Sequence, residues 1–437
     1  MKIGNNIMQQ QTLPFKIAED ATTPRLGVMR SGPPETVAAL DIGSSKLTCI
    51  IAQTQRDQLK IVSLATEPSR GIERGELTDM QEAAQAVAAV ISKAQAAAYV
   101  EHYNYFVGVG SKRAQGRNSR GSVSVTRESR EITPKNVQQA LRAARTISLP
   151  PDRQILDGVP QSFAVDDITG IRNPVGMTGS RLDAEVYLAT ESINCIRNVT
   201  SCLRSINCKT EGILFEPFAT AEAVLTADER KLGSVQIDIG GGTTDIVVYY
   251  ANAPRFVRVL PIGGEHIIRD VAVGLSATIE GARKLVHERG TACDVLVDAR
   301  EEIEVETAGG MMMHKSTLGE LCYIIECRIE EIFDIAQKEV SRAGLTGHCG
   351  GGVVVTGGVA HIKGIAKKAE QVFGTAARVG KPKIYTDDPA ICENPEYATA
   401  VGLLVYGLRM RRIVNKEARN PILSAAARSV SWIKEFF

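Results

Sequence analysis

Two short acidic segments that contain glycine constrain this chain more than any other feature. Residues 41–46 read DIGSSK and residues 238–245 read DIGGGTTD, and apolar stretches flank both. The pattern predicts strand, tight turn and strand, written twice in one sequence. Such turns can present backbone N–H groups to phosphate oxygens, while each aspartate can reach a cation or its waters. One copy is common in hairpins, but two copies indicate a nucleotide held between two similar halves.

A third glycine element has a different form. Residues 353–365 read VVVTGGVAHIKGI, which predicts a strand, a Gly-Gly turn and a helix. Without side chains, Gly357 and Gly358 would let a flat ring or a sugar lie on the backbone, and the helix N-terminus would offer free N–H groups. Alone, such a turn is often a packing feature. Together with the two acidic turns, it favours a nucleotide site.

The composition is that of an ordinary globular protein. The chain has 437 residues, of which 44% are hydrophobic and 23% are charged, and this length predicts roughly two to four domains. The formal net charge of +1 gives no sign of nucleic-acid binding. Nine cysteines without a C-x-x-C pair favour reduced thiols in a cytoplasmic protein over disulfides or a metal centre. No apolar run approaches the roughly 20 residues that span a bilayer.

The C-terminal tail carries a separate signal. Residues 409–421 are basic and polar and are predicted to be a linker, and residues 422–437 have the apolar spacing of a short amphipathic helix. Such a helix can lie in a membrane interface with support from the linker cations. The alternative is a final helix that docks on the protein's own surface. The residues expected to enter the membrane are Leu423, Val430, Trp432, Ile433, Phe436 and Phe437.

The ordered set of three glycine elements resembles the actin, Hsp70 and sugar-kinase superfamily. The resemblance implies two lobes, each with a five-stranded mixed sheet flanked by helices, that close on ATP and Mg²⁺. Asp41 and Asp238 would bind the Mg²⁺ through water, and Lys46 would place a positive charge near the phosphates. The nucleotide-binding residues implied by the resemblance are Asp41, Gly43, Ser44, Ser45, Lys46, Asp238, Gly240, Gly241, Gly242, Thr243, Thr244, Gly357 and Gly358.

Two further assignments follow from the same resemblance. Glu216, in the sequence EPFAT, matches the start of the helix that links the lobes and could position the attacking water or a Mg²⁺ water. An acidic residue beside a proline at a helix start also stabilises that helix by itself. Glu280 and Lys284 match a pair that flanks the adenosine. An ordinary ion pair at this i, i+4 spacing on a helix surface is the alternative.

Within the superfamily, the chain resembles the bacterial cell-division family FtsA. Four passages carry the resemblance: residues 68–75 (PSRGIERG), 171–177 (IRNPVGM), 397–404 (YATAVGLL) and 431–434 (SWIK). The resemblance covers residues 36–437. It implies an α/β fold of two actin-like (RNase H-like) lobes around a nucleotide cleft, with an inserted α+β subdomain 1C in place of actin's 1B and a C-terminal amphipathic helix.

The family organisation gives each segment an expected place. The expected parts are a disordered extension (1–35), subdomain 1A (36–103 and 182–219), subdomain 1C (104–181), subdomain 2A (220–263 and 346–408), subdomain 2B (264–345), a linker (409–421) and the membrane-targeting helix (422–437).

The resemblance also implies a function and partners. The chain would polymerise on the cytoplasmic face of the inner membrane at the division site and tether the tubulin-like protein FtsZ, with slow ATP hydrolysis at most. The FtsZ tail would bind subdomain 2B, with Arg328 as one contact. Other expected partners are further copies of the chain, later division proteins at subdomain 1C and an anionic membrane surface. The alternatives are a sugar-kinase-like phosphotransferase and an Hsp70-like chaperone ATPase.

Overall fold

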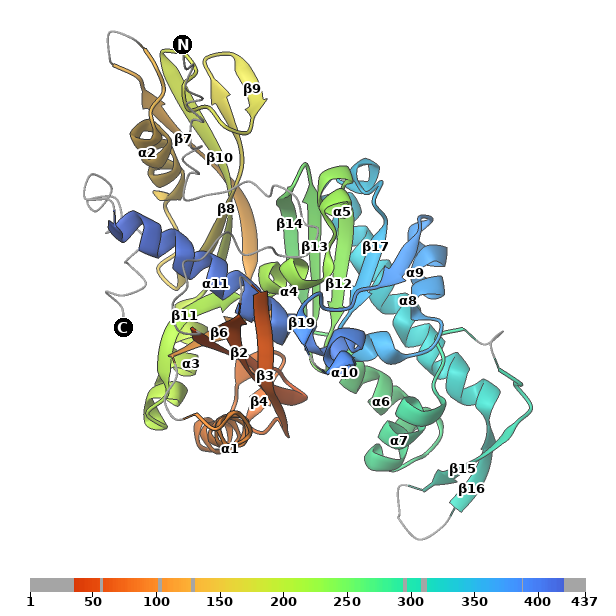
Figure 1. Ribbon diagram of the computed structural model, residues 1–437. Helices are drawn as coiled ribbons and strands as arrows, with labels where there is room; N and C mark the ends of the chain where they lie inside the picture. The colour runs from red at the N-terminus through yellow and green to blue at the C-terminus, as the bar shows by residue number, and fades with distance from the viewer. Residues whose placement is uncertain are drawn as a thin grey trace, which may run out of the picture.

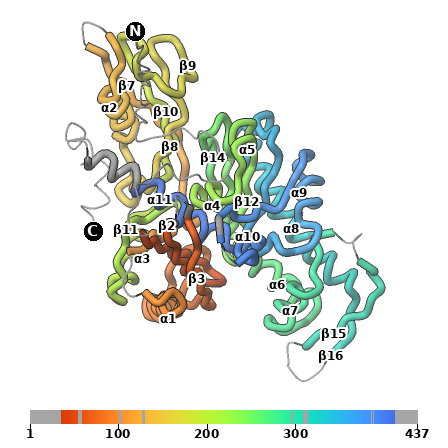
Figure 2. Tube along the Cα trace, viewed as in Figure 1, coloured from red at the N-terminus to blue at the C-terminus, as the bar shows by residue number. Residues whose placement is uncertain are grey.

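The structure is a computed structural model that describes residues 35–55, 58–100, 104–126, 130–293, 297–307, 313–386 and 388–419. The predicted extension therefore lies almost entirely outside the described residues, and so does the tail from residue 420, with all six residues expected to enter the membrane. Two α/β lobes lie side by side, and a smaller sheet projects from the first lobe on the side away from helix α1 (Figures 1 and 2).

The first lobe is built on a mixed sheet of order β11-β6-β1-β2-β3-β19. Strands β1, β2 and β3 are antiparallel neighbours, and β6 and β11 run parallel to β1 on its other side. Both faces of β1 are buried from residue 37 to 40, because helices cover both faces of the sheet. The strands are β1 (Thr36–Ile42), β2 (Lys46–Gln55), β3 (Gln58–Pro68), β6 (Asn104–Val109), β11 (Lys209–Phe215) and β19 (Tyr385–Thr386), with the small hairpin β4 (Ile72–Glu73) and β5 (Glu76–Leu77) beside them.

Helices sandwich this sheet. Helix α1 packs on β2 and β3 beside α3, and α11 with α4 packs on the opposite face (Figure 1). The Asp79 side chain caps α1 by accepting hydrogen bonds from two backbone N–H groups of the first turn. The helices are α1 (Met80–Ala98), α3 (Ile193–Ser205), α4 (Glu216–Val224) and α11 (Ala398–Arg419).

The second lobe repeats the first strand by strand. Its sheet has the order β14-β13-β12-β17-β18, with the same pattern of two antiparallel and two parallel neighbours as β3-β2-β1-β6-β11. The prediction of five-stranded mixed sheets is confirmed here, and the first lobe adds β19 at its edge. The strands are β12 (Ser234–Ile239), β13 (Thr244–Tyr250), β14 (Ala253–Leu260), β17 (Val353–Thr356) and β18 (Ala377–Val379).

The remaining elements of the second lobe are mostly helical. Three of them, α6, α7 and α8, pack together below the sheet and carry the hairpin β15 and β16 (Figure 1). The elements are α5 (Ala227–Leu232), α6 (Gly264–Gly274), α7 (Ile279–Arg289), β15 (Glu302–Glu306), β16 (Met313–Thr317), α8 (Leu318–Arg342), η2 (Thr346–His348), η3 (Gly358–His361), α9 (Ile365–Phe373), α10 (Pro389–Glu393) and η4 (Pro395–Tyr397).

The projecting sheet has the order β7-β10-β8-β9, and α2 covers one of its faces. Its bounds correct the predicted insert of residues 104–181. Strand β6 pairs with β1 and β11 and so belongs to the first lobe, whereas β10 pairs with β7 and β8 and so belongs to the insert. Its elements are β7 (Gln115–Ser124), α2 (Pro134–Arg145), β8 (Arg153–Val165), β9 (Ile168–Ile171) and β10 (Arg181–Ser192).

Helix α11 corrects a second boundary. The sequence predicts a helix that ends near Arg409, followed by a linker at 409–421, but the helix continues to Arg419. Two of its basic residues are held by acidic residues of the first lobe: Arg409 pairs with Glu222 at 3.1 Å, and Arg411 pairs with Glu211. These cations therefore stabilise a packed helix rather than solvate a linker. Within the described residues, no helix is both long enough and apolar enough to cross a membrane.

Candidate nucleotide cleft

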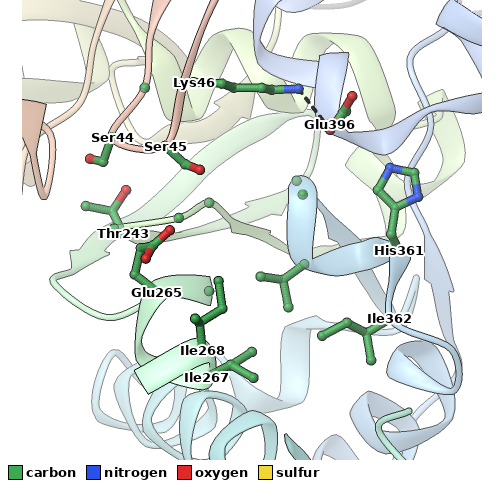
Figure 3. Close-up of a pocket in the computed structure, with 18 of the residues that line it drawn as sticks. Ser44, Ser45, Lys46, Thr243, Glu265, Ile267, Ile268, His361, Ile362 and Glu396 are labelled. Carbon is green, nitrogen blue, oxygen red and sulfur yellow. Dashed lines mark ion pairs between the residues drawn. The ribbon is translucent and has the colours of Figure 1, made fainter. Parts of the chain in front are cut away.

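The two acidic glycine turns meet face to face between the lobes. A Cβ placed on Gly241 would lie 2.5 Å from the Cβ of Ser45, and one on Gly242 would lie 2.8 Å from the Cβ of Ser44. Only glycine leaves room for this approach. A hydrogen bond also supports the first turn, since the backbone N–H of Gly75 donates to the Ser44 hydroxyl at 2.9 Å. Figure 3 shows Ser44, Ser45 and Thr243 on one side of the resulting space.

The space between the turns is a cavity of about 470 Å³, a size typical of small-molecule sites. It extends from the two turns to the Gly-Gly element and to helices α6 and α7. The predicted residues that line it are Asp41, Gly43, Ser44, Ser45, Lys46, Glu216, Asp238, Gly240, Gly241, Gly242, Thr243, Gly357 and Gly358.

Four carboxylates gather at the turn end of the cavity: Asp41, Asp238, Asp245 and Glu216. Burial raises the pKa of Asp41 to about 7, against the effect of Lys46 and with a contribution from Asp238. Burial also raises the pKa of Glu216 and of Asp245 well above the usual values, and the neighbouring carboxylates raise both further. This end of the cleft therefore concentrates negative charge that a bound cation would relieve.

Lys46 is the cation that lines this end of the cavity. Its ammonium lies 3.0 Å from a carboxylate oxygen of Glu396 and 4.5 Å from the centre of the Tyr397 ring (Figure 3). Burial lowers the pKa of Lys46, and Glu396 opposes that change.

Two hydroxyl groups hold the Asp238 carboxylate in place, since Thr399 and Thr220 donate to it at 2.9 and 3.3 Å. Within the described residues, no three His, Cys, Asp or Glu side chains form a direct metal-binding group.

The opposite end of the cavity is apolar. Ile268 and Val286 come from α6 and α7, and Val359 and Ile362 come from the segment after the Gly-Gly turn. Gly358 has no heavy atom within 4 Å of the place where a Cβ would be, so the missing side chain keeps the cavity open. Its neighbour Gly357 has a positive φ of 87°, and a Cβ there would meet Asp238 Oδ1 at 2.2 Å. Apolar side chains of this kind can pack against a flat ring, whereas the backbone N–H groups of the glycine turns can bind phosphate oxygens.

Three predicted residues do not reach the cavity. Thr244 is buried behind its turn, where its hydroxyl donates to the Ile262 carbonyl at 2.7 Å. Glu280 and Lys284 lie on the outer face of α7, and the Glu280 side chain is 86% exposed. The face of α7 that lines the cavity instead carries Arg283 and His287.

Sequence reasoning also missed residues that do line the cavity. They are Asp245, Glu265, Arg283, His287, Glu396 and Thr399, among others. A signal existed for Glu265, because residues 261–266 read PIGGEH and repeat the pattern of a strand, a Gly-Gly turn and a helix. Asp245 is the last residue of the motif at 238–245 and lies on β13, so the sequence pattern also contained it. Arg283, His287, Glu396 and Thr399 come from helical segments whose rotation about their axes the sequence does not specify.

Arg328, expected to contact a partner, is already paired within the protein. Its guanidinium donates to Asp270 of α6, with one N···O distance of 3.0 Å, and also to Glu331 on its own helix. It lies outside the cavity and packs α8 against α6. Its contact with a partner stays a prediction.

Comparisons with known proteins agree with this geometry. The model of the family "Cell division protein FtsA" matches residues 235–402, and that of the "SHS2 domain inserted in FTSA" matches residues 111–190, close to the bounds of the projecting sheet. The chain is 33% identical to the cell division protein FtsA of Pseudomonas aeruginosa over 374 residues, which cover 85% of this chain and 89% of the relative.

Two solved structures share the fold at low sequence identity. One is the PilM-PilN type IV pilus biogenesis complex, with a TM-score of 0.61 and 17% identity over 86% of this chain and 99% of that one. The other is MreB5 of Spiroplasma citri bound to ADP, with a TM-score of 0.53 and 12% identity over 87% of this chain and 99% of that one. Both likenesses are evidence for the two-lobed architecture alone.

Proposed function

This chain belongs to the FtsA family of cell-division proteins, and on that premise we propose that it is an ATP-binding scaffold that polymerises on the membrane and tethers FtsZ there. It is an actin-like cell-division protein. The observation that carries the nucleotide part is the pair of glycine turns that face each other across a cavity with an apolar far end. Phosphates would lie between the turns, and the base would lie between α7 and the Gly-Gly element.

The carboxylates fit a bound Mg²⁺. Asp41 and Asp238 would hold it through water, and Asp245 and Glu216 lie in the same charged group. The Oδ1 atom of Asp245 is buried and has no hydrogen-bond partner among the described residues, which is costly unless an ion or its water meets it. When bound, Mg²⁺ would neutralise phosphate charge. Glu216 would orient a water near the phosphates. The Lys46 ammonium would leave its ion pair with Glu396 and bind a phosphate oxygen instead.

Lys46→Gln should raise the Kd of the full chain for Mg-ATP about ten-fold or more, because it removes a charged contact worth roughly 1.5–3 kcal/mol. Isothermal titration calorimetry measures the change. Lys93→Gln is the matched control, since Lys93 pairs with Glu67 on the outer surface of the first lobe. An unchanged Kd in Lys46→Gln would remove the phosphate role of Lys46. Failure of the unaltered chain to bind any nucleotide would overturn the nucleotide proposal itself.

The partner surface of the second lobe is proposed to lie on subdomain 2B. A groove of about 320 Å³ there is lined by α6, β16 and α8, with Leu275, Lys315 and Ile324 among its residues. Tyr323, which also lines the groove, is 66% exposed, and Val273 of α6 is 80% exposed. Large exposed apolar side chains around a groove indicate a protein contact. The proposed occupant is the acidic tail of FtsZ, and Lys315, which pairs with Glu302 at 2.7 Å in the free protein, is proposed as a second cationic contact in addition to Arg328.

Membrane attachment is proposed for residues 422–437, which lie outside the described residues. A chain that ends at Asn420 should lose most of its co-sedimentation with vesicles of anionic lipid in the presence of Mg-ATP, because it lacks the apolar residues of the tail. The full chain should sediment with these vesicles and should carry FtsZ with it. Vesicles of neutral lipid are the control for the basic residues. Equal amounts of the two forms in the pellet would contradict the anchor.

The projecting sheet is proposed as subdomain 1C, the recruitment site for later division proteins. The model of the inserted SHS2 domain matches residues 111–190, and the strands and helix of the projecting sheet run from Gln115 to Ser192. It also contacts the second lobe, since the Gln161 amide donates to the Pro254 carbonyl and the backbone N–H of Val257 donates to the Tyr187 hydroxyl, both at 2.8 Å. A movement of the lobes on nucleotide binding would therefore reach this subdomain.

A further inference from the structure

One charged pair lies on the cavity wall between the glycine turns and the apolar end. Glu265, near the start of α6, and Arg283, on α7, form a bidentate ion pair with N···O distances of 2.8 and 3.0 Å. Both side chains line the cavity, and Glu265 and Arg283 are partly exposed to solvent, at 29% and 31%. Paired geometry of this kind fixes a carboxylate in direction as well as in place.

The backbone fixes where Glu265 stands along the cavity. Its N–H donates to the Gly241 carbonyl at 2.9 Å, so its Cα is held directly against the second glycine turn. One turn of helix further on, Ile268 belongs to the apolar end. Figure 3 shows Glu265 on the same side of the cavity as Thr243, with Ile268 beyond it. Glu265 thus lies between the place of the phosphates and the place of the base.

In a nucleotide, the sugar lies between the phosphates and the base. A carboxylate can only accept hydrogen bonds, and the ribose hydroxyls are donors that a deoxyribose lacks at one position. The Arg283 guanidinium is also kept charged, because Glu265 raises its pKa. It holds the carboxylate while leaving acceptor capacity free, since each carboxylate oxygen can take more than one hydrogen bond.

We propose that the Glu265 carboxylate accepts a hydrogen bond from a ribose hydroxyl and makes the cleft selective for ribonucleotides over deoxyribonucleotides, with Arg283 as its positioning residue. The inference rests on the proposed nucleotide function, because it needs a nucleotide in the cavity. It differs from a structural role for the ion pair. A structural pair would change the stability of the α6–α7 contact but not the ratio of affinities for two sugars.

The test is calorimetry of the full chain with Mg-ATP, Mg-2′-deoxyATP and Mg-3′-deoxyATP. The unaltered chain should bind ATP about ten-fold more tightly than at least one deoxy analogue, the value of a hydrogen bond to a charged acceptor. Glu265→Ala should bring that ratio close to one, and Glu265→Gln should give an intermediate ratio. Arg283→Ala should lower the ratio while the carboxylate remains.

Glu280→Gln is the matched control. Glu280 contacts the same guanidinium at 3.7 Å but points away from the cavity, so its ratio should equal that of the unaltered chain. Equal affinities of the unaltered chain for ATP and both analogues would overturn the inference, and so would an unchanged ratio in Glu265→Ala. Both results leave ATP binding intact and are therefore distinct from failure of the proposed function, in which no nucleotide binds.

Discussion

Without divalent cations, the protein should be about 2 kcal/mol less stable to unfolding at pH 8 than at pH 5. The figure is for Asp41 alone, whose pKa rises to about 7 from the usual 3.8 because the folded chain buries it. Glu216 and Asp245, whose pKa values are also raised, change the stability in the same direction. In this window the folded state holds a proton that the unfolded state has released, so raising the pH removes stability. Between pH 5 and the folded pKa of about 7, this effect covers about two pH units, which corresponds to about 3 kcal/mol, and water in the cleft should screen part of that.

Bound Mg-ATP should reverse this dependence, since a cation stabilises the ionised carboxylates. Thermal and urea unfolding from pH 5 to 8, with EDTA or with Mg-ATP, measure both effects. Asp41→Asn is the control, and its unfolding free energy should fall less over the same pH range. The difference between the two proteins removes the contributions of other groups that titrate in both. One such group is His266, whose pKa is lowered and whose effect on stability has the opposite sign. Glu222, with a pKa of about 2, contributes a constant amount above pH 5. A stability that rises from pH 5 to 8 equally in both forms would contradict the assignment.

Local patterns predicted the parts of the site that the backbone forms. The residues at 241, 242 and 357 must be glycine, because a Cβ there would meet the facing turn or Asp238. The repeated strand order followed from the repeated motif. Such features depend on a few contiguous residues and on the backbone conformation that these residues allow, so they can be predicted from a single sequence.

Features that depend on tertiary packing could not be predicted from local sequence patterns. Arg283 rather than Glu280 lines the cavity because α7 is rotated by its packing against α6 and α8. The bounds of the insert depend on which sheet β6 and β10 join, and both strands have the same apolar character in the sequence. The packing of α11 at Arg409 and Arg411 involves Glu222 and Glu211, which lie 187 and 200 residues earlier in the chain.

Gly402→Ala should destabilise the protein by roughly 3 kcal/mol, the upper part of the usual range for overpacking. In the interior of an unobstructed helix, Gly→Ala normally stabilises by about 1 kcal/mol. Here the new Cβ would lie 2.0 Å from the carbonyl oxygen of Ala219 in α4, a backbone atom that cannot rotate away. The steric term therefore outweighs helix propensity, and α11 must move off α4.

The same displacement should weaken nucleotide binding. Helix α4 begins with Glu216 at the cavity, and α11 carries Thr399, whose hydroxyl holds Asp238 at 2.9 Å together with Thr220 of α4. Urea unfolding and the Kd for Mg-ATP should thus change together in Gly402→Ala. Gly347→Ala is the control, because no atom lies within 4 Å of its new Cβ. A Gly402→Ala protein as stable as the parent would show that α4 and α11 are not locked at this contact, and that the cleft does not depend on their packing.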